Sequence, residues 1–193
     1  RVVGAILGLQ FSLEEPNLLT GEHKSPEYKK INPMSTIPAL KDGDFLLADS
    51  HAIILYFLNK YGGAHKEKLY PSDLRVRALV DQGLFFDTGV AFRQLLNITG
   101  PTPTNIEQIT DAYAVLESWL ENRPYIATDH VTIADICLGS SVSSLQSIHL
   151  IEKLFLSIVC YMNKLLIKQK LKFMHIPFCL GSSFLLHAHS PQQ

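Results

Sequence analysis

The stretch from Ile31 to Gly63, INPMSTIPALKDGDFLLADSHAIILYFLNKYGG, constrains the fold more than any other part of the chain. Ile37 precedes a proline, which favours an extended backbone at that residue. The residues that follow alternate around an Asp-Gly pair, a pattern that predicts two antiparallel strands joined by a tight turn. Asp49 and Ser50 then provide a helix N-cap signal, and a glycine pair ends the apolar helix that follows. The stretch therefore predicts a strand, a turn, a second strand and a capped helix in one compact unit.

The second half of the chain carries helical patterns throughout. Residues 66–73 are polar and contain a proline, so they form the predicted linker. Beyond them, Leu74–Leu96 and Ile106–Leu120 each repeat apolar residues every three or four positions, which is the spacing of amphipathic helices. Thr132 and Asp135 have the spacing of a capping box, so we expect a structural role for Asp135. The sequence as a whole predicts an α+β fold.

Composition and charge exclude several classes of function. The chain has 193 residues, 47% of them hydrophobic, which is enough for one or two domains with a buried core. Its formal net charge is -1, whereas nucleic-acid-binding proteins carry an excess of basic residues. The longest apolar stretch near the carboxy terminus, Leu154–Met162, is too short to span a bilayer. We therefore expect a protein that binds neither nucleic acid nor membrane.

Cysteine and histidine usage predicts a cytoplasmic protein without a metal ion. The three cysteines, Cys137, Cys160 and Cys179, form no C-x-x-C motif and no paired framework. This pattern favours buried thiols in a reducing compartment. His187 and His189 have no nearby cluster of carboxylates or cysteines, so we expect tail residues rather than metal ligands.

Five segments together resemble, in order and spacing, the cytosolic glutathione transferases, and most closely the insect epsilon class with delta as its neighbour. The resemblance covers roughly residues 5–146, and several linked motifs are more specific than one. It implies a thioredoxin-like, glutathione-binding domain at residues 1–63 and an all-helical domain at residues 72–193, of which 147–193 diverge. The helical domain would supply most of the hydrophobic substrate pocket. The segments are NLLTGEH, INPMSTIPAL, ADSHAIILYFLNKYG, VDQGLFFDTGVAF and VTIADICLGSSVSSL.

The resemblance implies a glutathione site in the first domain. Ile37 would precede a cis Pro38. Its backbone N–H and C=O would form antiparallel, strand-like hydrogen bonds with the cysteinyl moiety. Ser50, at a helix N-terminus, would meet the γ-glutamyl carboxylate, and Asp49 the glutamyl ammonium group. His23 stands where epsilon members place a histidine near the glycyl carboxylate. The structural alternatives are an N-cap for Asp49 and Ser50, a solvated loop for His23 and a turn for Pro38.

The hydrophobic substrate site would lie along the first long helix of the second domain. The same aromatic residues at helical spacing are also typical of an ordinary core, and that alternative stays open. Two positions depart from the family pattern, because Ser35 replaces a usual histidine and Leu96 stands where an arginine is expected. The departure at Ser35 weakens or removes one expected glutathione contact, and we expect the two departures together to lower the affinity for glutathione. The candidate lining residues are Phe85, Phe86, Phe92 and Leu95.

No catalytic residue is assigned within the chain. Delta and epsilon members use a serine hydroxyl near the start of the first helix, where it stabilises the thiolate of glutathione. The alignment places Arg1 in or at the start of that helix, so we expect the first strand and the serine upstream of it. We expect a sheet edge to be left unpaired as a result. Ser12 falls in the following strand region and is no substitute.

Three readings of function follow. The resemblance implies an enzyme that conjugates glutathione, as co-substrate and without a cofactor, to small hydrophobic electrophiles. It also implies a homodimer. The alternative is a catalytically silent protein that binds glutathione or a lipophilic ligand. A third reading is an incomplete gene product that does not fold stably, which a cooperative melting transition would exclude.

Overall fold

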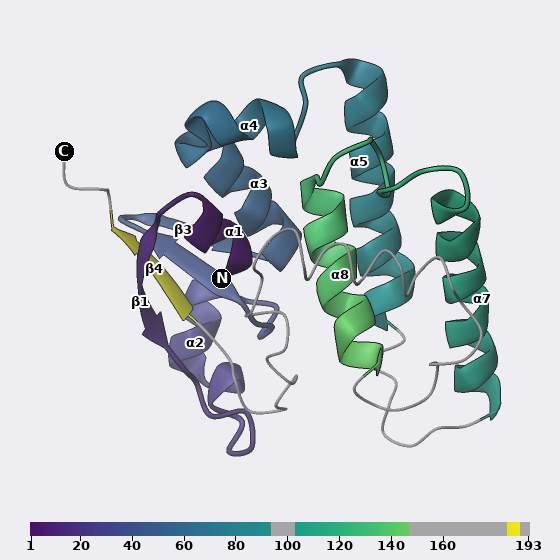
Figure 1. Ribbon diagram of the computed structural model, residues 1–193. Coiled ribbons are helices and arrows are strands. Elements are labelled where there is room, and N and C mark those ends of the chain that lie inside the picture. Colours follow the sequence, from purple (N-terminus) through teal and green to yellow (C-terminus); the bar gives the residue numbers. More distant parts are fainter. Residues whose placement is uncertain (94–102, 147–184, 190–193) are drawn as a thin grey trace. The chain divides into compact units, whose positions relative to one another are not determined.

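The computed structural model describes residues 1–93, 103–146 and 185–189, which fall into two compact units (Figure 1). Unit 1 comprises Arg1–His65 together with Phe178–Gln193, and unit 2 comprises Lys66–Pro177. In the described residues, unit 1 contains both strands and helices, and unit 2 contains helices. The predicted linker is partly helical, because α4 (Gly63–Leu69) runs into it through residues with good helix propensity.

Unit 1 consists of a small sheet with short helices. Its helical segments are α1 (Val2–Ile6), η1 (Glu22–Lys24), α2 (Pro26–Ile31) and α3 (Ser50–Tyr61). Its strands are β1 (Gln10–Glu14), β2 (Ala39–Asp42), β3 (Phe45–Ala48) and β4 (Leu185–His189).

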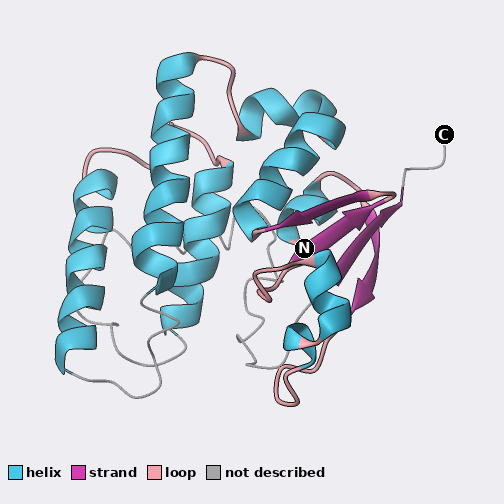
Figure 2. Ribbon diagram, turned by 180° about the vertical axis from the view of Figure 1, so that it is seen from behind, coloured by secondary structure: helices cyan, strands magenta, loops and turns pink. Residues whose placement is uncertain are grey.

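The sheet has the strand order β1-β4-β2-β3 (Figures 1 and 2). Strands β2 and β3 form the predicted antiparallel hairpin, and Gly43 takes the positive φ of +61° that its turn requires. Strand β4 runs antiparallel to β1 and parallel to β2. The hairpin and the capped helix α3 after it confirm the pattern in the sequence.

Strand β4 departs from the sequence-based expectation. Residues 72–193 are expected to be helical, but Leu185–His189 form a strand in the sheet of unit 1. This strand lies between β1 and β2, so neither of them has an unpaired edge on that side. Five residues, LLHAH, carry too little periodicity to indicate a strand. The pairing with two distant strands, rather than local preference, determines this element.

The core of unit 1 lies between the sheet and α3. Leu40 of β2, Ile53 and Phe57 of α3, and Leu9 form one buried cluster. Ile53 and Phe57 are four residues apart, so one face of the helix covers the sheet. Burying each such side chain contributes about 1.5–3 kcal/mol, which fixes α3, and with it the residues at its N-terminus, against β2.

Unit 2 is helical in its described residues. The first long helix was predicted to run over Leu74–Leu96, but α5 ends at Phe86 and a π-helical segment, η2 (Asp87–Ala91), follows. Residues 94–96 lie outside the described part of the chain. The other helices are α7 (Pro103–Leu120) and α8 (Ile133–Gln146).

Helix α8 is the centre of unit 2. Ile133, Ala134 and Leu138 are fully buried, and α8 packs closely against α5. A Cβ atom at Gly83 of α5 would lie 2.8 Å from the Cβ of Ala134, so only glycine allows this approach. Among the helices that the structure describes, none is long and apolar enough to cross a membrane.

Candidate functional site

The register of the β2–β3 hairpin brings four of the predicted site residues to one end of the sheet. Ala39 pairs with Ala48, and antiparallel partners have their Cα atoms about 4.5–5.5 Å apart. The pair at positions 37 and 38 enters β2 immediately before Ala39, and the pair at positions 49 and 50 leaves β3 immediately after Ala48. The two pairs predicted to bind glutathione are therefore neighbours in space.

The loop before Pro38 is fixed by buried polar side chains. The peptide bond between Ile37 and Pro38 is cis, as expected. The carbonyl oxygen of Thr36 accepts hydrogen bonds from the Tyr28 hydroxyl at 2.9 Å and from Nδ2 of Asn32 at 2.7 Å. Asn32 is only 1% exposed, and burial raises the pKa of Tyr28, which therefore stays a neutral donor. These two residues hold the backbone of the candidate site in place.

The sequence alone did not indicate Tyr28 and Asn32 as residues of the site. The Asn-Pro pair at positions 32 and 33 indicated only a turn. The side-chain oxygen of Asn32 also accepts a hydrogen bond from the N–H of Met34 at 3.0 Å. Both ends of the Asn32 amide are therefore used within the loop. An Asn-x-x-x-Thr spacing before an Ile-Pro pair was the available signal.

Asp49 is both an N-cap and a strained residue. Its Oδ1 accepts hydrogen bonds from the N–H groups of His51 at 2.9 Å and Ala52 at 3.0 Å, which confirms the N-cap reading. Its φ is +78°, and Ser35 has a φ of +56°, in a region that non-glycine residues rarely adopt. Such conformations cost about 1–3 kcal/mol and cluster at functional sites.

Ser50 is the first residue of α3. Its side chain is half-buried, and its Oγ lies 3.3 Å from Nδ1 of His51. Asp49 caps the N–H groups of His51 and Ala52, but not that of Ser50. The N–H and the hydroxyl of Ser50 thus stand at the positive end of a twelve-residue helix, an arrangement that favours an anion.

His23 lies in η1, which leads directly into α2 and so to the loop before Pro38. The side chain is half-buried rather than a solvated loop residue. Its Nδ1 atom is buried and has no hydrogen-bond partner among the residues that the structure describes. An unsatisfied buried polar atom costs about 1–3 kcal/mol, and a ligand that bonds to it would offset this cost.

Two of the candidate hydrophobic residues, Phe85 and Phe86, differ in their exposure within unit 2. Phe85 is 77% exposed, whereas Phe86 is half-buried and packs on Trp119 with ring centroids 5.0 Å apart. Consecutive helical residues point about 100° apart, which explains this difference. Phe92 is half-buried, and Leu95 lies outside the described residues. The contact with Trp119 favours the core reading for Phe86.

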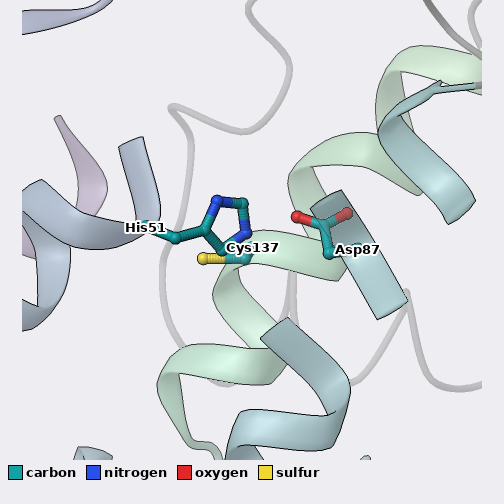
Figure 3. A group of neighbouring side chains, drawn as sticks. All are labelled: His51, Asp87 and Cys137. Carbon is teal, nitrogen blue, oxygen red and sulfur yellow. The ribbon is translucent and has the colours of Figure 1, made fainter. Parts of the chain in front are cut away.

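A buried acid and a buried thiol lie close together in unit 2. Asp87 of η2 and Cys137 of α8 have a carboxylate oxygen and a sulfur within 4.8 Å of each other (Figure 3). Figure 3 also draws His51, which belongs to unit 1. Protein zinc sites use three or four ligands, so these two groups of unit 2 do not by themselves form a metal site. Cys137 is a buried thiol, as the sequence predicts.

Comparisons with known proteins match both parts of the chain. The family model "Glutathione S-transferase, N-terminal domain" matches residues 1–65, and "Glutathione S-transferase, C-terminal domain" matches residues 102–152. Glutathione S-transferase 1 of Manduca sexta is 40% identical over 141 residues, which are 68% of this chain and 64% of that protein. The matched region thus spans less than two thirds of the length of this relative.

Solved structures extend the likeness over more of the chain. An epsilon-class glutathione S-transferase from the housefly, Musca domestica, is 37% identical with a TM-score of 0.78, covering 86% of this chain and 80% of that one. A glutathione transferase homologue from Drosophila mojavensis, solved with bound glutathione, is 34% identical with a TM-score of 0.76, covering 94% and 84%. Identity and coverage of this extent, together with the thioredoxin-like first part and the helical second part, show that the chain belongs to the glutathione S-transferase family.

Proposed function

We propose that the chain binds glutathione at the end of the β2–β3 hairpin. The observation that carries this proposal is the pairing of Ala39 with Ala48, which sets the Ile37-Pro38 pair beside Asp49 and Ser50. The γ-glutamyl carboxylate meets the N–H and hydroxyl of Ser50 at the positive end of α3. The backbone N–H and C=O of Ile37 pair with the cysteinyl part of the peptide.

The glutamyl ammonium group and the glycyl carboxylate of glutathione require partners of different chemistry. The carboxylate of Asp49 uses Oδ1 in capping α3, and its side chain is about half exposed, so Oδ2 is offered to the glutamyl ammonium group. His23 is the proposed partner of the glycyl carboxylate. The buried Nδ1 atom of His23, which lacks a partner among the described residues, supports this role.

The proposed reaction is conjugation of glutathione to a small hydrophobic electrophile. The thiolate forms a carbon–sulfur bond while the leaving group departs with its electron pair, and the thiol proton is lost beforehand. A free thiol has a pKa of about 8.5, so a protein donor must stabilise the thiolate at neutral pH. We assign no residue of this chain to that role. Phe86, Phe92 and Leu95 are proposed for the electrophile on the family resemblance alone, whereas the exposed side chain of Phe85 is proposed for the contact between subunits.

The alternative is a carrier that binds glutathione without turning it over. The binding residues all lie between His23 and Ser50, whereas the thiolate donor has no assigned residue, so binding and catalysis are separable. The rate at which the expressed chain conjugates a chromogenic aryl halide, measured beside its glutathione affinity, distinguishes the two. A rate above the uncatalysed one supports the enzyme, and binding without such a rate supports the carrier.

We also propose a homodimer in the cytoplasm. Leu74 and Phe85 are 80% and 77% exposed on α5, with Leu79 partly exposed on the same helix. Exposed apolar residues gathered on one element are typical of protein–protein contacts. The buried thiol of Cys137 agrees with a reducing compartment.

A further inference from the structure

The proposed glutathione contacts lie at one end of β2 and α3. The Ile37-Pro38 pair leads into β2, and Ser50 is the first residue of α3. From this end both elements run toward the turn of the hairpin, because β2 ends at Asp42 and the last turns of α3 contact that residue. Each element therefore has one end at the proposed site and the other end at Asp42.

Four side chains join the two elements at the end away from the site. Oδ2 of Asp42 accepts a hydrogen bond from Nζ of Lys60 at 2.6 Å. The same oxygen accepts hydrogen bonds from the hydroxyls of Tyr56 at 2.7 Å and Tyr61 at 2.9 Å. Nζ of Lys60 also lies 5.3 and 5.0 Å from the centroids of these two rings. These four residues form the Asp42 cluster, whose hydrogen bonds are of the strong, charge-assisted kind.

Apolar packing holds α3 against β2 between the two ends. Ile53 and Phe57 of the helix are buried together with Leu40 of the strand. The hydrophobic effect is non-directional, so this packing resists separation of the helix from the sheet more than a change in the angle between them. Hydrogen bonds depend on direction and weaken steeply when they bend. The Asp42 cluster is thus the directional contact at the far end of α3.

A small change in the angle of α3 is enough to affect the proposed site. A twelve-residue helix is about 18 Å long, so a tilt of about 5° around its middle displaces each end by about 0.8 Å. A hydrogen bond of about 2.9 Å that is stretched by this amount is effectively lost. Loosening the Asp42 cluster should therefore misplace the N–H and the hydroxyl of Ser50.

Given the proposed function, on which this inference rests, we propose that Asp42 is a positioning residue for glutathione. The Asp42 cluster sets the angle at which Ser50 meets the γ-glutamyl carboxylate. Bound glutathione joins Ile37 to Ser50 at one end of β2 and α3, and the cluster joins the same two elements at the other end. Because both favour one arrangement of the two elements, each strengthens the other, and the coupling between them is reciprocal.

Calorimetric titration of glutathione into Asp42→Asn at neutral pH tests the coupling. The substitution keeps the shape of the side chain but removes its charge, and its amide nitrogen cannot accept a hydrogen bond. We expect the dissociation constant to rise at least about fivefold, which is the lower end of typical coupling between sites. Asp44→Asn is the matched control, because Asp44 is an exposed residue of the same hairpin turn. Its affinity for glutathione should equal that of the wild type.

Hydrogen exchange at the last turn of α3 gives a readout that a purely structural role would not change. The N–H of Gly62 donates to the carbonyl oxygen of Leu58 at 3.1 Å and reports on the fraying of this turn. Saturating glutathione should slow the exchange of this N–H in the wild type and in Asp44→Asn, but not in Asp42→Asn. Equal slowing in all three proteins would overturn the coupling, because the cluster would then only add stability.

Tyr61→Phe takes the place of Asp42→Asn in both measurements if that variant does not fold. It removes one donor from the cluster and keeps the ring that packs against the core of unit 1. We expect the same changes with a smaller amplitude. Equal dissociation constants for the wild type and the folded variant would overturn the positioning role of Asp42 and leave the proposed function standing. Absence of binding to the wild type would overturn the proposed function and the positioning role together.

Discussion

Asp135 accepts a hydrogen bond from the backbone N–H of Ile126, nine residues earlier in the chain, with a nitrogen–oxygen distance of 2.9 Å. Its other oxygen accepts from the N–H of Thr132 at 2.7 Å and from the Thr132 hydroxyl at 2.8 Å. Asp135 is fully buried. One carboxylate thus joins the loop before α8 to the first turn of that helix, which is a structural role.

Replacing Asp135 by Ala should destabilise the protein by at least about 2 kcal/mol, because the buried donors of Ile126 and Thr132 lose their acceptor. Asp135→Asn should also destabilise it, since its amide nitrogen would face a donor. Urea unfolding measures both effects. Glutathione affinity of the folded fraction should not change. A fall in affinity without a fall in stability would instead place Asp135 in a binding site.

A methyl group at position 83 should disturb the packing of α5 on α8. The added Cβ would lie 2.8 Å from the Cβ of Ala134 and 2.9 Å from Cγ2 of Ile126. We expect Gly83→Ala to cost about 1–3 kcal/mol in spite of the better helix propensity of alanine. Gly89→Ala is the matched control, because its added Cβ would meet no atom within 4 Å apart from its chain neighbours and the backbone of its own helix. Equal shifts in melting temperature for the two variants would contradict this account of the packing.

The carboxylate of Asp42 should give unit 1 a pH-dependent stability. Its Oδ2 accepts hydrogen bonds from the Lys60 ammonium group at 2.6 Å and from the hydroxyls of Tyr56 and Tyr61 at 2.7 and 2.9 Å. Burial raises the pKa of Asp42, but these donors together outweigh it and hold the pKa below its usual value. These contacts link the β2–β3 hairpin to α3.

A carboxyl group whose pKa is lower in the folded state than in the unfolded state stabilises the protein only while it is ionised. The contribution of Asp42 is therefore complete above its unfolded pKa of about 3.9 and disappears as the pH falls through the lower folded value. Urea unfolding of the wild type and Asp42→Asn between pH 7 and pH 2 should give a difference in free energy of unfolding that becomes smaller below about pH 4. A difference that is constant with pH would contradict the role of the charge.

The exposed face of α5 should control the oligomeric state. Phe85→Asp places a charge in the proposed dimer contact and should shift the sedimenting species to the monomer. Because Phe85 is 77% exposed, the stability of the monomer should change little. Leu19→Asp is the control, since Leu19 is 91% exposed in unit 1. A dimer that persists in Phe85→Asp would place the contact elsewhere.

Much of unit 1 could be predicted from local sequence. The Asp-Gly turn and the Asp49 cap act on residues close to them in the chain, so the hairpin and α3 followed from pattern alone. The change from α-helix to π-helix after Phe86 could not be predicted, because the apolar spacing of a long helix continues through η2. The placement of β4 depends on strands more than 140 residues away, as the partners of His187 are Ser12 and Lys41.

The candidate site divides in the same way. The family resemblance predicts the Ile37-Pro38 pair and Ser50 as site residues, and the hairpin register explains their proximity. The side chain of Asn32, which holds the loop before Pro38, could not be predicted because its turn signal is indistinguishable from that of a surface loop. The exposure of Phe85 depends on the rotation of α5 within unit 2, which apolar spacing alone leaves undetermined.

Calorimetric titration of glutathione into the chain and into Ser50→Ala tests the central claim most directly. Ser12→Ala is the control, because Ser12 lies in β1, away from the N-terminus of α3. We predict a binding heat for the wild type and for Ser12→Ala, and a dissociation constant at least about tenfold higher for Ser50→Ala, as expected for a lost hydrogen bond to a charged group. The melting temperature of Ser50→Ala should stay within a few degrees of the wild type. No binding heat for the wild type, or equal affinities for the wild type and Ser50→Ala, would contradict a glutathione site at this end of the hairpin.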